Sequence, residues 1–230
     1  MLWKINLCII LVAGVAALYA QEGQASVLIN EIFADPPAGL LGDANNDGVR
    51  SGTADEFIEL MNFGLIEVNL SSWSLADSVS TRHIFPSNTV LAPNAFLVVF
   101  GGGSPVLPGV NWQTASSGGL GLNNDGDQVI LFDADHQIIE EVIYGSEGGK
   151  DQSIARYPDG EGTSFILHSE IGQSEGALYS PGTGLNPADV TNISHDTEPL
   201  GNPAVPELPS FLYVAMGWGA LLLKGKVRLI

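Results

Sequence analysis

The sequence predicts an all-β domain, a sandwich of two β-sheets, in the middle of a chain of 230 residues. The chain contains 28 glycines and 13 prolines, a share typical of proteins with many turns and short strands rather than of helical bundles. Short apolar runs recur between turn residues at the spacing of an all-β protein. No long window shows the hydrophobic period of a helix, which argues against an α/β alternation.

Nine apolar runs are predicted to be strands because turn residues bound each of them. They are residues 27–33, 56–63, 73–75, 83–85, 96–100, 129–132, 138–144, 153–157 and 165–167. In the second run Ile58 and Leu60 alternate with Glu59, which indicates a strand with one face more buried than the other. Residues 133–137 (Asp-Ala-Asp-His-Gln) predict a hairpin loop between two strands.

These segments favour an immunoglobulin-like β-sandwich of about nine strands. A domain of about 160 residues buries near 70 % of its unfolded surface, which is enough for a core without disulfides. We therefore expect no helix longer than two turns between residues 26 and 186.

Composition excludes several classes of protein. Acidic residues number 26 and basic residues 8, so the net charge of −18 argues against a nucleic-acid partner, which calls for clustered Lys and Arg. A hydrophobic fraction of 45 % excludes a mostly disordered chain. The chain has one cysteine, Cys8, and this excludes a disulfide framework and a cysteine zinc site.

Residues 1–20 have the form of a secretory signal peptide. Lys4 supplies the positive charge, and an apolar run from Leu7 to Leu18 is too short for a membrane span of about 20 residues. Cleavage is expected between Ala20 and Gln21. The alternative is an uncleaved N-terminal anchor.

Residues 205–230 form a second targeting segment. Pro206 and Glu207 precede residues 211–223, which carry no charge, and three basic residues follow (Lys224, Lys226 and Arg228). A 13-residue helix reaches about 20 Å, so flanking residues must extend this short transmembrane helix. The basic cluster places the body of the protein outside the cytoplasm.

The order of these features resembles the PEP-CTERM sorting signal of bacterial exported proteins. The resemblance implies processing near Pro206 and Glu207 by an exosortase-like membrane protease. A plain C-terminal membrane anchor is the alternative, and both readings place the protein in the cell envelope. Residues 187–204 are polar and contain three prolines, so we expect a flexible linker that spans about 25 Å.

The middle of the chain resembles the lamin tail domain family. The residues that carry the resemblance stand in the family's order: 28–32 (Leu-Ile-Asn-Glu-Ile), 35–36, 55–60 (Asp-Glu-Phe-Ile-Glu-Leu), 62, 70–77 (Leu-Ser-Ser-Trp-Ser-Leu-Ala-Asp), 91–93, 96–99, 122–127, 153–156, 158–160 and 180–186. The resemblance covers about 160 residues, 26–186, and implies an immunoglobulin-like sandwich. It implies no shared catalytic residues.

One loop has the oxygen spacing of a calcium site. Asp43, Asn45 and Asp47 stand at positions 1, 3 and 5 of an EF-hand-like loop, and Gly48 at position 6 permits the bend. The backbone carbonyl of Val49 stands at position 7. Position 12 is not acidic, and Asp55 or Glu56 is expected to close the site instead. The alternative is a metal-free turn rich in Asp and Asn.

Catalytic patterns are weak in this sequence. Residues 172–176 match Gly-x-Ser-x-Gly, but no apolar strand leads into them, so we interpret them as a loop. Glu31 and Glu59 could form a carboxylate pair for glycoside hydrolysis, although both belong to the pattern of a non-catalytic family. Trp73 is expected in the core, and an exposed Trp112 would favour polysaccharide binding.

The function predicted from the sequence is a non-enzymatic envelope or extracellular module. Its expected partner is a protein or polysaccharide of the envelope or extracellular matrix, with Ca²⁺ as a stabilising ion. The alternative is an extracellular hydrolase of polysaccharide or phosphoester whose active site has no recognisable motif. The two differ in whether an open cleft gathers ionisable groups.

Overall fold

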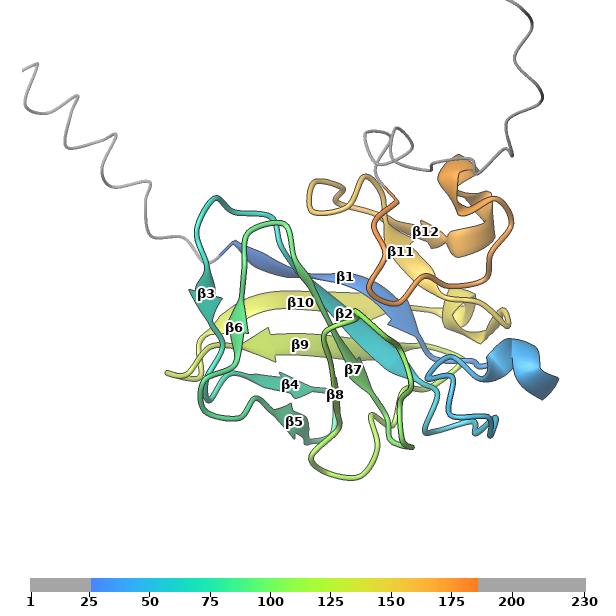
Figure 1. Cartoon of the computed structure of the whole chain (residues 1–230), viewed down its shortest axis with the longest axis horizontal. Coiled ribbons are helices and arrows are strands. Elements are labelled where there is room, and N and C mark those ends of the chain that lie inside the picture. Colours follow the sequence, from blue (N-terminus) through green and yellow to red (C-terminus); the bar gives the residue numbers. More distant parts are fainter. Residues whose placement is uncertain (1–25, 186–230) are drawn as a thin grey trace, which may run out of the picture. The chain divides into compact units, whose positions relative to one another are not determined.

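The computed structural model describes residues 26–185, which form two β-sheets and a two-stranded ribbon (Figure 1). The predicted signal peptide, linker and sorting signal lie outside the described residues, as do Ala20, Gln21, Pro206 and Glu207. Between residues 26 and 185 no helix is long and apolar enough to cross a membrane.

The larger sheet has six strands in the order β12-β11-β1-β2-β7-β8. Their bounds are β1 Val27–Phe33, β2 Phe57–Asn62, β7 Phe96–Phe100, β8 Trp112–Thr114, β11 Ile154–Arg156 and β12 Phe165–Leu167. All neighbours are antiparallel except β7 and β8, which are parallel. A β-bulge in β1 between Ile29 and Glu31 interrupts the pairing with β2.

The smaller sheet has four antiparallel strands in the order β10-β9-β4-β5. Their bounds are β4 Ser74–Ala76, β5 Thr81–Ile84, β9 Asp127–Phe132 and β10 Ile138–Tyr144, and the ribbon pairs β3 Val68–Asn69 with β6 Val90–Leu91. Strands β9 and β10 form the predicted hairpin. In its loop the Asp133 carboxylate accepts the N–H groups of Asp135 at 2.9 Å and Gln137 at 2.8 Å.

The helices of the described residues are four short 3₁₀ helices. They are η1 Gly39–Gly42, η2 Ser146–Gly149, η3 His168–Glu170 and η4 Gly172–Ser174. The expectation of no helix longer than two turns is therefore confirmed for this part of the chain. All nine predicted strands have a counterpart, whereas β3, β6 and β8 were not predicted. The strands β3 and β6 have two residues each, and β8 (Trp112–Thr114) contains one apolar residue, so none of them shows an apolar run.

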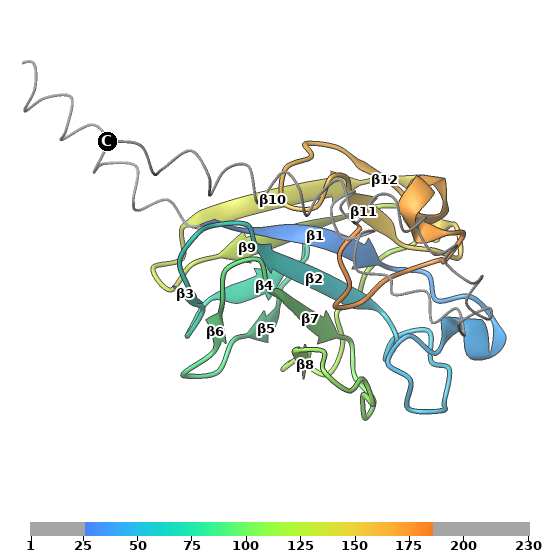
Figure 2. The same cartoon turned by 45° about the horizontal axis from the view of Figure 1, so that its top comes forward.

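The main core lies between the two sheets, which Figure 2 shows from a second direction. Ile58 and Leu60 of β2 contribute to it from the larger sheet, and Val129 and Leu131 of β9 from the smaller one. Trp73 is also in this core, as predicted.

The opposite face of the larger sheet is buried too. Phe33, Phe57 and Phe100 pack there with ring centroids 5.4 to 5.6 Å apart, and the Tyr179 ring lies 4.7 Å from that of Phe33. The expectation of one more buried face for β2 is therefore wrong, since all six of its residues are buried. Segments distant in the sequence cover the second face, and the pattern within one strand does not report such a cover.

Candidate functional site

The loop of residues 43–55, which we call the acidic loop, joins η1 to β2. Its carboxylates accept hydrogen bonds from backbone N–H groups of the same loop. The Asp43 carboxylate accepts the N–H groups of Asp47 at 3.1 Å and Gly48 at 2.9 Å. Gly48 has a φ of +88°, which a side chain would disfavour, so glycine suits the bend as predicted. The Asp47 carboxylate accepts the N–H groups of Val49 at 2.9 Å and Ser104 at 3.0 Å.

Asp55, rather than Glu56, closes this loop. The Asp55 carboxylate is fully buried and accepts the N–H groups of Asn45 at 3.1 Å and Ser51 at 2.6 Å. Burial raises the pKa of Asp55, and the charges of Asp43 and Asp47 raise it further. Three carboxylates therefore lie near one another in this loop.

Glu56 points away from the acidic loop. Its carboxylate accepts the N–H groups of Gly121 at 3.1 Å and Leu122 at 3.3 Å. Asp55 bonds to Asn45 and Ser51 whereas Glu56 bonds to Gly121 and Leu122, so the two carboxylates do not share one site. Within residues 26–185, no group of three or more His, Cys, Asp or Glu side chains is placed to hold a metal ion. The calcium site stays a prediction.

Glu31 and Glu59 form the centre of a second acidic cluster. They are direct cross-strand partners on β1 and β2, and their exposed fractions are 1 % and 0 %. Glu31 accepts hydrogen bonds from the Ser153 hydroxyl at 2.5 Å and from the Ser180 hydroxyl at 2.9 Å. Glu59 accepts the N–H of Gly182 at 2.6 Å.

His168 is the buried base of this cluster. Its Nδ1–H donates to the carbonyl of Ala177 at 2.8 Å, since a carbonyl can only accept. Its Nε2 lies 2.9 Å from the Ser180 hydroxyl and 3.9 Å from the Glu31 carboxylate. Burial raises the pKa of Glu31, and the His168 charge opposes part of that rise. Burial raises the pKa of Glu59 well above its usual value, and the charge of Glu31 adds to this.

The cluster continues to the last described residue. The Asn30 amide donates to Glu59 at 3.0 Å and to Asp159 at 3.1 Å, and Asp159 accepts the N–H of Leu185. Residues 177–185 are thus held to the sheet by carboxylates of β1, β2 and the β11–β12 loop. We call residues 177–185 the clasp.

This arrangement opposes the glycosidase interpretation of Glu31 and Glu59. A glycosidase needs two carboxyl groups that face a substrate across an open site. Here both carboxylates are buried and accept hydrogen bonds from the protein's own donors. The sequence signal for this cluster is a Glu in the middle of an apolar strand, but it does not identify Ser153, His168 or Ser180 as partners.

A third charged group surrounds Glu56. The Arg82 guanidinium pairs with Asp77 and lies near Glu56 and Asp127, whose charges it offsets. Asp127 also accepts hydrogen bonds from the Ser78 hydroxyl at 3.1 Å. Burial raises the pKa of Glu56 to about 7, against the lowering effect of its two backbone bonds and of Arg82.

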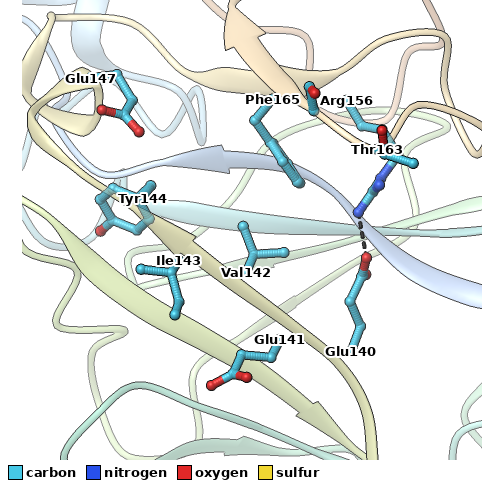
Figure 3. A pocket seen from close by; sticks show the side chains of 10 residues that line it. Glu140, Glu141, Val142, Ile143, Tyr144, Glu147, Arg156, Thr163 and Phe165 are labelled. Carbon is cyan, nitrogen blue, oxygen red and sulfur yellow. Dashed lines mark hydrogen bonds and ion pairs between the residues drawn. The ribbon is translucent and has the colours of Figure 1, made fainter.

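An open groove of about 320 Å³ lies between β10 and the start of β12 (Figure 3). Arg156 and Glu140 form an ion pair at one end, drawn dashed in Figure 3, and the Arg156 guanidinium lies 4.8 Å from the centroid of the Phe165 ring. Glu141 and Ile143 border the groove with exposed side chains. The groove therefore combines acidic, aromatic and aliphatic surface.

The remaining predicted features have simple structural roles. Residues 172–176 include η4 and a turn without a preceding long strand, so they form a loop as interpreted from the sequence. Trp112 lies on the edge strand β8 and is 37 % exposed. It is a single aromatic residue rather than a row of them.

Together, the two sheets and the internally bonded carboxylates define an all-β sandwich domain. The family model of the Lamin Tail Domain matches residues 20–146, more than half of the chain. The chain therefore belongs to the lamin tail domain family, whose domain is immunoglobulin-like and non-catalytic. No curated protein matches the chain. The match ends before β11 and β12, although both strands pair within the larger sheet.

Proposed function

We propose that this protein is an exported, non-enzymatic module of the cell envelope that binds a protein or polysaccharide of the matrix. One observation carries the non-enzymatic part: the buried carboxylates of Glu31, Glu56 and Glu59 accept bonds from the protein itself instead of lining an open cleft. A hydrolase needs ionisable groups that face its substrate. In this domain the three carboxylates face donors of the same chain instead.

The location is proposed from the two ends of the sequence. Residues 1–20 would direct export with cleavage before Gln21, and residues 205–230 would insert in the membrane or be processed by an exosortase-like protease near Pro206 and Glu207. The domain would then lie on the extracytoplasmic side, on a linker of residues 187–204.

The groove beside β10 is the surface that we propose for the partner. It is open, and it presents the aromatic ring of Phe165 together with Glu141 and Ile143. Aromatic and aliphatic side chains bordered by polar groups are typical of recognition surfaces for proteins and sugars.

The test is retention of envelope material on the immobilised mature protein. Mass spectrometry of the envelope fraction should find a chain that begins at Gln21, and this form should retain matrix protein or polysaccharide. The double variant Glu141→Lys with Ile143→Lys should lose most of the retention, while Val79→Lys, at another exposed apolar residue, should keep it. Equal retention by both variants would exclude the groove. Hydrolysis of polysaccharide or phosphoester by the unmutated protein would contradict the non-enzymatic function.

We also propose that Asp43, Asn45, Asp47, Asp55 and the Val49 carbonyl bind one Ca²⁺ in the extracellular medium. Support comes from the 1-3-5 oxygen spacing and from the three neighbouring carboxylates, whose charges oppose one another without a cation. The Asp43 and Asp55 carboxylates accept hydrogen bonds from backbone N–H groups, and these bonds would have to persist beside the ion or rearrange.

Calcium is expected to raise the melting temperature by about 2 to 4 °C in millimolar Ca²⁺, if Kd is near 10⁻⁴ M and the gain is about 1.4 kcal/mol. Asp47→Ala should remove this rise because it removes a ligand without a change in the core. Since Asp47 also bonds to backbone N–H groups, the quantity to compare is the calcium-induced shift within each variant. Asp125→Asn, a change of an exposed carboxylate elsewhere, should keep the shift. Identical melting curves in calcium and in chelator would show that the loop is a turn only.

A further inference from the structure

The loop that joins β2 to β3 exposes three large apolar side chains within four residues. Phe63, Leu65 and Ile66 are 46 %, 92 % and 63 % exposed. Single exposed apolar residues are ordinary on a soluble protein, but a contiguous group indicates a contact surface. We call residues 63–66 the apolar loop.

The apolar loop lies beside the first described residue. The Phe63 N–H donates to the Ser26 carbonyl at 2.8 Å, and the Ser26 hydroxyl donates to Asn62 at 2.8 Å. Figures 1 and 2 both show the start of β1 next to the loop between β2 and β3. The first described residue, Ser26, therefore lies at the apolar loop.

The last described residue, Leu185, lies at the same end of the larger sheet, because it bonds to Asp159 and the adjacent Gly160 packs on Phe63. Gly160 packs so closely on Phe63 that a Cβ atom at Gly160 would lie 2.8 Å from the Cβ atom of Phe63. The neighbouring Asp159 holds the N–H of Leu185. Both ends of the described chain thus lie near the apolar loop, and each continues towards an apolar segment of the sequence, 7–18 or 211–223.

We propose that the apolar loop inserts into the headgroup region of the membrane that anchors the chain. This inference rests on the proposed C-terminal insertion. In the sequence, residues 186–210 separate Leu185 from the apolar run that begins at Phe211, and a flexible chain of this length would span about 25 to 30 Å. Such a connection would keep the domain close to the bilayer, and Leu185 leaves the domain at the end that exposes Phe63, Leu65 and Ile66.

The contact would be apolar rather than electrostatic. The exposed charged residues next to the loop are Glu67 and Glu161, which an anionic surface repels. A shallow insertion of Leu65 and Ile66 between headgroups needs no basic residue. We therefore expect contact with zwitterionic lipid that does not weaken with salt.

The experiment uses the full chain in phosphatidylcholine vesicles that carry a lipid-bound quencher. Cys8→Ala removes the one natural cysteine, and Leu65→Cys then places a polarity-sensitive dye on the apolar loop. Val106→Cys is the matched control, since Val106 is exposed and its N–H donates to Asn45 beside the acidic loop at the opposite end of β2. Quenching at position 65 should exceed that at position 106 about tenfold, at low and at high salt.

A second labelled chain carries Ile66→Cys with Leu65→Asp, and it should float with the vesicles but lose the quenching. Flotation with an unquenched dye at position 65 would overturn this inference and leave the anchored module intact. A chain that does not float with the vesicles would overturn both the proposed membrane anchoring and the lipid contact of the apolar loop. A change of the dye at position 65 without lipid, growing with protein concentration, would show that the loop contacts a second copy, and that result also overturns membrane contact.

Discussion

A chain that ends after residue 176 is expected to lose its folded state, whereas a chain that ends after residue 186 keeps the stability of the whole domain. The first deletion removes the clasp. Glu31 then loses the N–H and hydroxyl of Ser180, Glu59 loses the N–H of Gly182, and Asp159 loses the N–H of Leu185. The carboxylates would be left with fewer partners or become open to water along a core face.

The size of this effect follows from the cost of leaving buried hydrogen-bond acceptors without their donors. One such loss costs about 1 to 3 kcal/mol, and three carboxylates each lose at least one donor. Domains of this size are stable by about 5 to 15 kcal/mol in total. The deletion also removes Tyr179, whose ring packs on Phe33. The loss therefore approaches or exceeds the whole free energy of unfolding.

Thermal and urea unfolding of the two truncated chains, both compared with the full chain, measure this effect. Ser180→Ala is a graded companion, because it removes one hydroxyl from Glu31 and His168 and should cost about 1 to 3 kcal/mol. A chain ending at 176 that melts cooperatively within a few degrees of the chain ending at 186 would mean that the clasp is not part of the fold.

Glu56→Gln is expected to make the domain more stable at pH 8 and to leave its stability unchanged at pH 4. The folded protein holds the Glu56 proton up to about pH 7, whereas an unfolded chain releases it near pH 4.5. The folded state therefore binds more protons in this interval, and the free energy of unfolding falls as the pH rises from about 4.5 to 7. The amide stays neutral at all these pH values and can still accept the N–H groups of Gly121 and Leu122.

The difference between variant and unmutated protein should grow from near zero at pH 4 to about 3 kcal/mol at pH 8, since one pKa unit corresponds to about 1.4 kcal/mol. Urea unfolding at several pH values measures it. Glu67→Gln, at an exposed carboxylate, is the matched control and should show no such trend. The raised pKa values of Glu31 and Glu59 act in the same direction in both proteins, so they cancel in this comparison. A variant that is less stable at pH 8 would show that Glu56 is needed as an anion.

Local chemistry explains what could be predicted from the sequence. The nine predicted strands and the hairpin at residues 133–137 follow from apolar runs and turn residues, which neighbouring positions specify. Trp73 belongs to the core because it precedes a strand in an apolar stretch. The order of short motifs along the chain was sufficient to identify the family, which the family match confirms.

Other features depend on contacts between distant residues. Asp55 and Glu56 are neighbours with equal chemistry, yet Asp55 accepts a bond from Asn45 of the acidic loop and Glu56 accepts one from Gly121. The sequence alone therefore left both as ligands. The strands β3 and β6 pair with each other, and β8 pairs with β7, so each of the three depends on a partner at a distance in the sequence.

The sequence by itself determined the all-β class, the positions of the main strands and the acidic character of the loop at 43–55. Only the tertiary structure decided that Glu31 and Glu59 are buried partners, that Ser180 donates to Glu31 and that His168 lies beside Glu31. The physical reason is register: the cross-strand pairing of β1 with β2 brings the two carboxylates together, and the clasp returns from about 120 to 150 residues further along the chain. No local period encodes a contact over that distance, because its energy is gained only when both sheets have formed.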